Sequence, residues 1–412
     1  MTVLRLSEAD EAMLAGEAGP QVALGMRIVT GLAAASGARS LLDISRAHID
    51  GCLYNGRASL DFAERLTGAQ VAVPTTLNVS SLDLLHPDLI QSSPETQQRA
   101  RALMDAYTSI GAQPTWTCAP YQSLVRPSFG EQIAWAESSA VVFANSVLGA
   151  RTDRYGDFID AAAAITGRAP AAGLHLDENR RAEVAFDVAA LSPGLKQRDA
   201  FFAMLGLIVG TESGKRVPAV VGIDEATEDQ LKTFGAAAAS SGSVGMFHVV
   251  GVTPEAPTLR DVAPAELPTI TVTGEMLRTA RQQVNAGADS SQLGSVHLGT
   301  PHYSISQLDA VLATLARRAV KLDVYISTGR DVLVRWGKAD LLTELGVTIV
   351  TDTCTYVTSI VDPRSGSAMT DSAKWAYYAP GNIGVKAIFG SMEECVETAV
   401  AGRLTERPDQ WT

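Results

Sequence analysis

The stretch Val347-Thr348-Ile349-Val350-Thr351-Asp352-Thr353-Cys354 joins a run of β-branched residues to a short polar loop. Such a run favours a buried strand. In open α/β sheets, ligands bind beyond the carboxyl ends of the strands, which is where Cys354 falls. Asp352 and Thr353 could hydrogen-bond a ligand there. The alternative reading is a small buried cysteine that fills a loop.

Strand and helix patterns alternate on both sides of this stretch, which predicts an α/β fold with largely parallel sheets. A helix is expected over residues 94–110, with Ser93 as its N-cap. A long apolar helix is expected over residues 131–147. The proline-rich stretch 253–268 is the best candidate linker.

The 412 residues are more than one hydrophobic core usually holds. We therefore expect several α/β lobes, at residues 1–128 with Cys118, 129–268, and 269–412 with Cys354 and Cys395. The net charge of −12 argues against a nucleic-acid partner, although a local basic cluster could still bind an anionic substrate.

The lack of a recognisable targeting signal and the small number of cysteines predict a soluble cytoplasmic protein. The first ten residues lack the apolar run of a signal peptide. The longest apolar stretch, residues 201–209, is too short to span a bilayer, so no membrane association is expected. Four cysteines make no disulfide scaffold, and reduced thiolates from distant parts of the chain suggest a metal or iron–sulfur site.

The other cysteines each have two readings. Cys118 lies in a segment without helical pattern, as a metal ligand or as a core cysteine beneath a loop. Cys395 follows a capping-box pattern at Ser391 and Glu394, and it shares an apolar stripe that favours core packing. A helix N-terminus would also lower a thiol pKa and suit a ligand. Cys52 is interpreted as packing.

Several polar loops could contact a substrate. The segment 48–56 has glycines at 51 and 56 and reads as a tight loop over a ligand. The segment 74–81 follows a strand, either as a substrate loop or as a capped turn. Arg151 could clamp a carboxylate, or it could complement a helix dipole. The candidate substrate-binding residues are His48, Asp50, Tyr54, Thr75, Thr76, Asn78, Ser80, Asn145, Ser146, Arg151, His302 and Lys374.

Several common enzyme motifs are missing from the sequence. The histidines form no HExxH pair, and the chain has no P-loop, no G-x-S-x-G elbow and no convincing dinucleotide fingerprint. These absences remove several common enzyme classes.

Eight segments together resemble aconitase X, the short branch of the aconitase superfamily. They match in order from near residue 41 to near residue 400, as residues 47–54, 73–78, 117–121, 134–140, 145–152, 299–302, 352–354 and 374–380. The resemblance implies a multi-lobed α/β/α hydro-lyase (dehydratase). It also implies an iron–sulfur centre held by Cys118, Cys354 and Cys395.

The resemblance leaves the form of the metal centre open. Three protein ligands would leave one iron free to act as a Lewis acid. The close C-x-x-C pair of larger aconitases is absent, so [4Fe-4S], [2Fe-2S] and mononuclear iron all stay possible. The family also needs a small swivelling domain that carries a serine base. We expect that domain on a separate small subunit, and the catalytic base within this chain is unknown.

The resemblance suggests a small hydroxy-acid substrate. The segments 48–54 and 375–378 look closer to the branch that dehydrates cis-3-hydroxy-L-proline to pyrroline-2-carboxylate. Arg151, Lys374 and the loop 75–81 would then fix the substrate carboxylate or amine. The alternatives are a 5-phosphomevalonate dehydratase large subunit, a non-catalytic iron-binding sensor or interaction subunit, and a metal-free α/β protein with buried cysteines.

Overall fold

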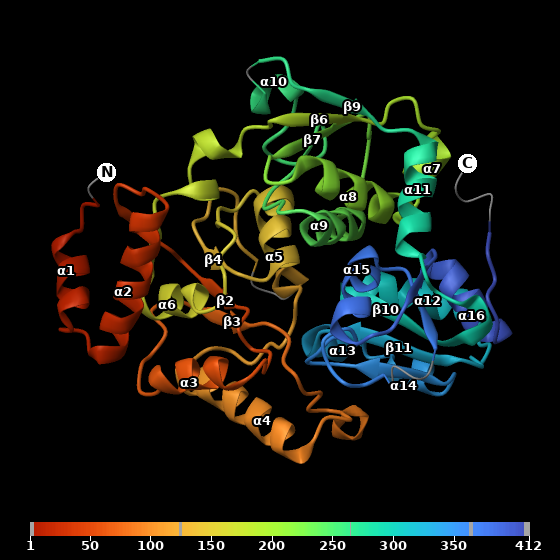
Figure 1. Cartoon of the computed structure of the whole chain (residues 1–412), viewed down its shortest axis with the longest axis horizontal. Helices are drawn as coiled ribbons and strands as arrows, with labels where there is room; N and C mark the ends of the chain where they lie inside the picture. Colours follow the sequence, from red (N-terminus) through yellow and green to blue (C-terminus); the bar gives the residue numbers. More distant parts are fainter. Residues whose placement is uncertain (1–3, 123–125, 264, 362–365, 408–412) are drawn as a thin grey trace. The chain divides into compact units, whose positions relative to one another are not determined.

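The computed structural model divides the chain into two compact units, the first with one parallel sheet and the second with two (Figure 1). The first consists of Met1–Leu82 and Ser92–Arg181, and the second of Asp83–Gln91 and Ala182–Thr412. The domain boundaries expected at residues 128 and 268 stay a prediction. The residues that the structure describes are 4–122, 126–263, 265–361 and 366–407.

The first unit is built on a three-stranded parallel sheet in the order β3-β2-β4. Its strands are β2 (Ala47–Ile49), β3 (Thr75–Leu77) and β4 (Ala134–Trp135), with β1 (Leu41–Asp43) and β5 (Arg168–Pro170) as a separate antiparallel pair. Its helices are α1 (Glu8–Ala15), α2 (Pro20–Ala35), α3 (Arg57–Arg65), α4 (Pro94–Ser109), α5 (Ser138–Phe143) and α6 (Ile159–Thr166).

The sequence predicts the bounds of α4 more accurately than those of α5. The helix expected at 94–110 is confirmed as α4, and the Ser93 side chain accepts a hydrogen bond from the Thr96 amide as its N-cap. The helix expected at 131–147 is wrong over its first part. Residues 134–135 pair with β2 as β4, and the Glu137 side chain caps a later start of α5. A π-helical turn, Ala144–Leu148, then continues α5.

The second unit holds two parallel sheets. The five-stranded sheet has the order β12-β11-β10-β13-β14, and the four-stranded sheet the order β8-β7-β6-β9. The strands are β6 (Val184–Asp187), β7 (Pro218–Val221), β8 (His248–Val249), β9 (Thr269–Thr271), β10 (Leu293–Tyr303), β11 (Asp323–Thr328), β12 (Val347–Val350), β13 (Ser367–Thr370) and β14 (Ala387–Phe389).

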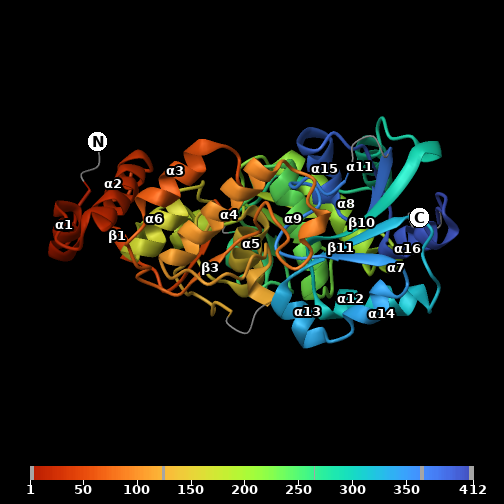
Figure 2. The same ribbon diagram turned by 90° about the horizontal axis from the view of Figure 1, so that it is seen from below.

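Helices cover both faces of the five-stranded sheet (Figure 2). Apolar side chains of α12 (Ile305–Leu315), α13 (Arg330–Trp336), α14 (Ala339–Thr343) and α16 (Met392–Ala401) share one core with the sheet. On the opposite face, Trp375 of α15 (Ala373–Asn382) stacks on His297 of β10, with ring centroids 4.7 Å apart. This is the expected α/β/α layering.

The remaining helices of the second unit accompany the four-stranded sheet. They are α7 (Pro193–Lys196), α8 (Asp199–Ser213), α9 (Glu228–Ser241), α10 (Leu259–Val262) and α11 (Gly274–Val284). The stretch expected as a linker contains α10, and its Ala256 and Val262 pack against Ala219 of β7. It is therefore part of the packed layer.

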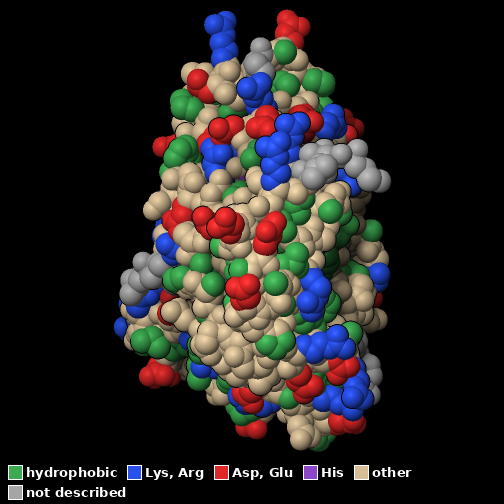
Figure 3. Space-filling view, turned by 90° about the vertical axis from the view of Figure 1, so that its left-hand side faces the viewer, with side chains coloured by type: hydrophobic (Ala, Val, Ile, Leu, Met, Phe, Trp, Pro, Cys, Tyr) green, Lys and Arg blue, Asp and Glu red, His purple; other side chains and the backbone are tan. Residues whose placement is uncertain are grey.

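The apolar stretch 201–209 lies within α8, which is buried on nearly all sides. Two glycines let α8 approach α9 closely: a Cβ at Gly206 would overlap the Phe234 carbonyl oxygen, and one at Gly210 would overlap Ala238. Among the described residues, no helix combines the length and apolarity needed to cross a bilayer. On the face shown in Figure 3, acidic and basic side chains are intermixed.

Substitution of Gly206 by alanine should destabilise the second unit, because the new methyl group meets backbone that cannot rotate away. Overpacking of this kind costs about 1–3 kcal/mol. Gly31 of α2 is the matched control, since a Cβ there meets nothing within 4 Å. Thermal unfolding should show a lower midpoint for Gly206→Ala and an unchanged or slightly higher one for Gly31→Ala. Equal midpoints would contradict the close approach of α8 and α9.

Candidate functional site

The carboxyl ends of β10 and β12 bring together, within the second unit, two side chains of types that can ligate a metal. Cys354 lies in the loop after β12, as the sequence predicts, and His302 lies at the end of β10. Both residues are buried. The Cys354 Sγ and a ring nitrogen of His302 lie within 4.8 Å of each other. This proximity follows from the parallel pairing of β10 and β12 with β11 between them.

One hydrogen bond fixes the His302 ring. Nε2 lies 3.1 Å from the Thr353 carbonyl oxygen, which can only accept, so Nε2 carries the proton. Nδ1 then carries the lone pair that a metal requires. Metal-binding histidines commonly donate their second ring nitrogen to a carbonyl in this way. A thiolate and a neutral imidazole suit iron or zinc, so the residues present fit a metal group.

The end of β10 requires glycine and packs tightly against β11. Gly299 has a φ of +88°, and a Cβ there would overlap the Ser327 carbonyl oxygen. A larger residue would push the His302 segment away from β11.

The loop before Cys354 is held by buried charge. Asp352 has a φ of +63° and is fully buried. Its carboxylate accepts two hydrogen bonds from the Arg330 guanidinium and one, of 2.9 Å, from the Leu84 amide. An aspartate in this left-handed conformation is uncommon, and the bidentate pair stabilises it.

A distant segment completes the support of this loop. The Asp83 carboxylate accepts hydrogen bonds from the Thr351 amide at 2.8 Å and from the Thr351 hydroxyl at 3.0 Å. Asp83–Gln91 belongs to the second unit although its neighbours in sequence belong to the first. Sequence analysis missed Asp83 and Arg330, because nothing local in the sequence signals a partner so far along the chain.

A buried polar chain lies on the α15 face of the sheet. The Trp375 indole donates to the Thr355 hydroxyl at 2.9 Å, and the same hydroxyl is hydrogen-bonded to His297 Nδ1, 3.0 Å away. His297 Nε2 is in turn hydrogen-bonded to the Ser295 hydroxyl at 2.9 Å. Burial lowers the pKa of His297 to about 3, so the ring stays neutral. The chain orients Thr355, which directly follows Cys354.

Cys395 has different surroundings. The predicted capping box at Ser391 and Glu394 is confirmed, and Cys395 lies in the first turn of α16. Its side chain is fully buried in the apolar core with Leu308 and Val396. Burial raises the pKa of the thiol well above its usual value, and nearby carboxylates raise it further. Of the two readings of Cys395, the surroundings favour core packing, since burial outweighs any lowering by the helix N-terminus.

A second polar cluster lies in the first unit, where the register of three strands sets His48 beside Thr76 and Trp135. His48 Nδ1 is 2.8 Å from the Thr76 hydroxyl, and the His48 and Trp135 rings are 5.8 Å apart. The Asn78 amide donates to the Asp50 carboxylate. The structure thus brings together four of the predicted substrate-binding residues: His48, Asp50, Thr76 and Asn78.

Three buried polar atoms of this cluster have no hydrogen-bond partner within the part of the chain that the structure describes: His48 Nε2, Asn78 Oδ1 and Trp135 Nε1. Buried polar atoms are rarely left without partners, so Trp135 Nε1 points to a ligand, while the Asn78 side chain interacts with the His48 ring. Burial lowers the pKa of His48 to about 4, although the Glu137 carboxylate and Asn78 partly oppose this shift. The ring is therefore neutral near pH 7.

Sequence analysis missed Asp160, which supports this cluster from α6. Its carboxylate accepts hydrogen bonds from the Asp50 amide at 2.6 Å and from the Ala161 amide at 2.7 Å. Burial raises its pKa to about 7 despite these bonds. No motif around residue 160 would have revealed this role.

The other predicted residues of the first unit mostly have local partners. The Asn145 amide donates to the Thr152 carbonyl at 2.9 Å, and Arg151 forms an ion pair with Asp177. The hydroxyls of Thr75 and Ser80 donate to the nearby carbonyls of Val73 and Leu82, at 2.8 and 3.0 Å. Ser146 is buried in the π-helical turn, and the Tyr54 hydroxyl accepts a hydrogen bond of 3.3 Å from Arg99.

Cys118 lies near the carboxyl end of β3. The amide of the preceding residue, Thr117, donates to the Leu77 carbonyl at 3.2 Å. The thiol-bearing residue itself is buried. Cys118 therefore occupies the same kind of position in the first unit's sheet as Cys354 does in the second.

Lys374 begins α15 and is buried. It lines a cavity large enough for about one water molecule, together with Lys232, Thr300, Tyr303 and Asp371. Tyr303 donates to Asp371, whose pKa burial raises to about 7.

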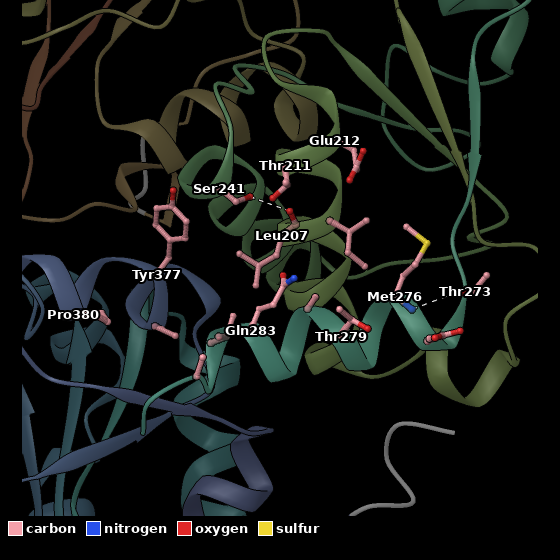
Figure 4. Close-up of a pocket in the computed structure, with 16 residues that line it drawn as sticks. Leu207, Thr211, Glu212, Ser241, Thr273, Met276, Thr279, Gln283, Tyr377 and Pro380 are labelled. Carbon is pink, nitrogen blue, oxygen red and sulfur yellow. Dashed lines mark hydrogen bonds between the residues drawn. The ribbon is translucent and has the colours of Figure 1, made fainter. Parts of the chain in front are cut away.

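A larger hollow of about 600 Å³ lies elsewhere in the second unit, among α8, α11 and α15 (Figure 4). The labelled side chains around it include Thr211, Gln283 and Tyr377. Among the described residues, its lining contains neither cysteine nor histidine, so the hollow lacks the chemistry of the Cys354 loop.

Comparison with known proteins identifies the family. Models of the aconitase X first, second and third domains match residues 3–178, 182–282 and 293–401. A cis-3-hydroxy-L-proline dehydratase of Pseudomonas aeruginosa is 45% identical over 99% of this chain and 72% of its own length. The chain belongs to the aconitase X family. The predicted resemblance is confirmed.

Further aconitase X relatives agree with this assignment. A cis-3-hydroxy-L-proline dehydratase of Hypocrea jecorina is 42% identical over 97% of this chain and 69% of its own length. A phosphomevalonate dehydratase large subunit of Methanothermobacter thermautotrophicus is 36% identical over 93% of this chain and 96% of its own length. The crystal structure of Thermococcus kodakaraensis aconitase X, in its holo-form, matches with a TM-score of 0.87 at 32% identity, over 96% of this chain and all of that one. The α/β fold and the dehydratase class are confirmed.

Replacement of His48 by glutamine should flatten the acid side of the stability profile. The folded-state pKa of His48, about 4, lies below the ordinary value of 6.5. As pH falls from about 6.5 towards 4, the unfolded chain therefore binds a proton that the folded chain refuses, and stability drops. The slope for one such group approaches about 1.4 kcal/mol per pH unit.

Thermal midpoints measured at pH 7 and pH 5 check this expectation. The fall in the thermal midpoint from pH 7 to pH 5 should be smaller in His48→Gln than in the parent protein. The other buried histidines are the same in both proteins, so they contribute equally to each fall. An equal drop in both proteins would show that His48 titrates normally.

Proposed function

We propose that this chain dehydrates cis-3-hydroxy-L-proline to pyrroline-2-carboxylate. The observation that carries the proposal is the level of identity to two named dehydratases of that substrate, 45% and 42%. The phosphomevalonate dehydratase large subunits reach only 30–36%.

The charges around His48 support a substrate that carries an ammonium group. The acceptors there include the Asp50 carboxylate and Asn78 Oδ1, with Glu137 and Asp160 close by. These groups suit the secondary ammonium of a hydroxyproline ring. A phosphate dianion is normally held by arginine and lysine side chains, which this cluster does not supply.

The metal group in this proposal is held by Cys354 and His302 of the second unit together with Cys118 of the first. Bound iron, as mononuclear iron or as a [2Fe-2S] or [4Fe-4S] cluster, would supply Lewis-acid polarisation of the substrate hydroxyl. His302 replaces Cys395 in this ligand set, because the Cys395 thiol has a raised pKa within an apolar core.

The chain's own residues prepare the site in this proposal. The Thr353 carbonyl holds the imidazole tautomer, and Arg330 and Asp83 keep the Cys354 loop in place. Asn78 and Asp50 orient the substrate amine, and Lys374 offers a cation to the carboxylate. Holding the substrate in one orientation lowers the entropic barrier to proton removal.

The proton acceptor in this proposal is a serine on a small swivel-domain subunit. Relatives named large subunits are matched over 94–99% of their length, whereas the two hydroxyproline dehydratases are matched over 69–72% of theirs. The name large subunit implies that those relatives have a small-subunit partner, which supports the partner in this proposal.

A second candidate is the dehydration of 5-phosphomevalonate, which the identity of 36% and 34% to two named phosphomevalonate dehydratase large subunits favours. Purified chain, with and without the small subunit, should be assayed against both substrates by product absorbance. Turnover of cis-3-hydroxy-L-proline when both subunits are present supports the first proposal. Turnover of 5-phosphomevalonate but not of cis-3-hydroxy-L-proline supports the second. No turnover of either substrate by an iron-loaded complex would favour an iron-binding sensor.

The cysteines should separate into two classes when each is replaced by alanine. Cys354→Ala and Cys118→Ala should lose bound iron and all measurable turnover, because each removes a proposed ligand. Cys52→Ala and Cys395→Ala should retain iron, since Cys52 donates to the Ile49 carbonyl at 3.4 Å and Cys395 packs in a core. Iron analysis after anaerobic reconstitution measures this. Equal iron loss in Cys354→Ala and Cys395→Ala would contradict this assignment and support Cys118, Cys354 and Cys395 as the three ligands.

A further inference from the structure

An ion pair in the first turns of α9 contacts the His302 segment. Lys232 Nζ is 2.8 Å from the Asp229 carboxylate, and the Lys232 side chain is only 2% exposed. A lysine buried to this degree is rare unless it is paired. Nothing in the sequence or in the likeness to relatives gave this pair a role.

The pair binds both ends of one short segment. Lys232 Nζ donates to the His302 carbonyl at 3.3 Å and also to the Gln307 side chain. The Asp229 carboxylate accepts hydrogen bonds from Ser304 at 2.8 Å and from Ser306 at 2.6 Å. Residues 302–307, from the end of β10 into the first turn of α12, are therefore fastened to α9.

The electrostatics of Asp229 favour its charged form. Burial alone would raise the pKa of this carboxyl, but the Lys232 side chain and the serine hydroxyls outweigh burial and lower it. The Asp229 carboxylate therefore stays ionised across the neutral range, and the hydrogen bonds that it accepts are charge-assisted.

We infer that Lys232 and Asp229 are positioning residues for the metal-binding imidazole. Lys232 donates to the His302 backbone carbonyl, and the Thr353 carbonyl accepts from its ring. The two bonds hold the backbone and the side chain of the same residue, so together they orient the imidazole relative to Cys354. Without Lys232, the backbone carbonyl loses its bond to α9. This inference rests on the proposed role of His302 as a metal ligand.

Lys232→Met tests the inference, because it keeps the apolar stem and removes the donor. Lys196→Met is the matched control: Lys196 also donates to a backbone carbonyl of the second unit, that of Gly222 at 2.7 Å, away from the His302 segment. Lys232→Met should retain iron about ten-fold less tightly, the usual effect of losing a residue that supports a metal ligand. Lys196→Met should bind iron normally.

Amide hydrogen exchange on the metal-free protein gives a readout that needs neither iron nor turnover. Exchange of residues 302–307 should speed up in Lys232→Met and stay unchanged in Lys196→Met. Unchanged exchange would overturn the inference. Faster exchange with normal iron affinity would also overturn it, because the pair would then be structural only.

The double variant Lys232→Met/Asp229→Asn covers the case in which Lys232→Met alone fails to fold. It leaves no unpaired buried charge, and it should show the same faster exchange and weaker iron retention. Suppose that the parent protein binds iron but turns over neither substrate, while these variants lose iron. That pair of results would refute the proposed function and keep the inference. If the parent protein bound no iron, the role of His302 and the inference would fail together.

Discussion

The hydrogen bond from the His302 ring to the Thr353 carbonyl joins the two segments on which the candidate site depends. It links the end of β10 to the loop after β12, and it sets the tautomer that presents a lone pair. The parallel sheet makes the bond possible, because parallel strands end at the same edge. The Asp352–Arg330 pair and the Asp83 contacts hold the rest of the Cys354 loop in place.

The structure supports this edge with charge more than with apolar packing. Asp83, Asp352 and the Asp229–Lys232 pair are each tied to backbone groups or hydroxyls at the ends of strands. Buried charges of this kind add little net stability compared with apolar packing, but they fix geometry. The apolar core of α12, α14 and α16 lies on one face of the sheet and supplies the stability. The division suits a site that must hold ligands in one arrangement.

Local sequence signals predicted the elements that have local causes. The β-branched run at 347–350 became β12, Ser93 capped α4, and the capping box at Ser391 began α16. The helix expected at 131–147 failed because pairing with β2 outweighed the apolar pattern. Asp83, Asp160 and Lys232 escaped prediction, since their roles come from partners dozens to hundreds of residues away. Cys395 illustrates the same limit, because only the packed core reveals that burial raises its pKa.

X-ray absorption at the iron edge of the reconstituted protein tests the central claim most directly, by comparing the parent with His302→Ala. The account predicts a nitrogen ligand beside the sulfur ligands in the parent, and its loss in the variant. A sulfur-only ligand shell that is identical in both proteins would contradict it.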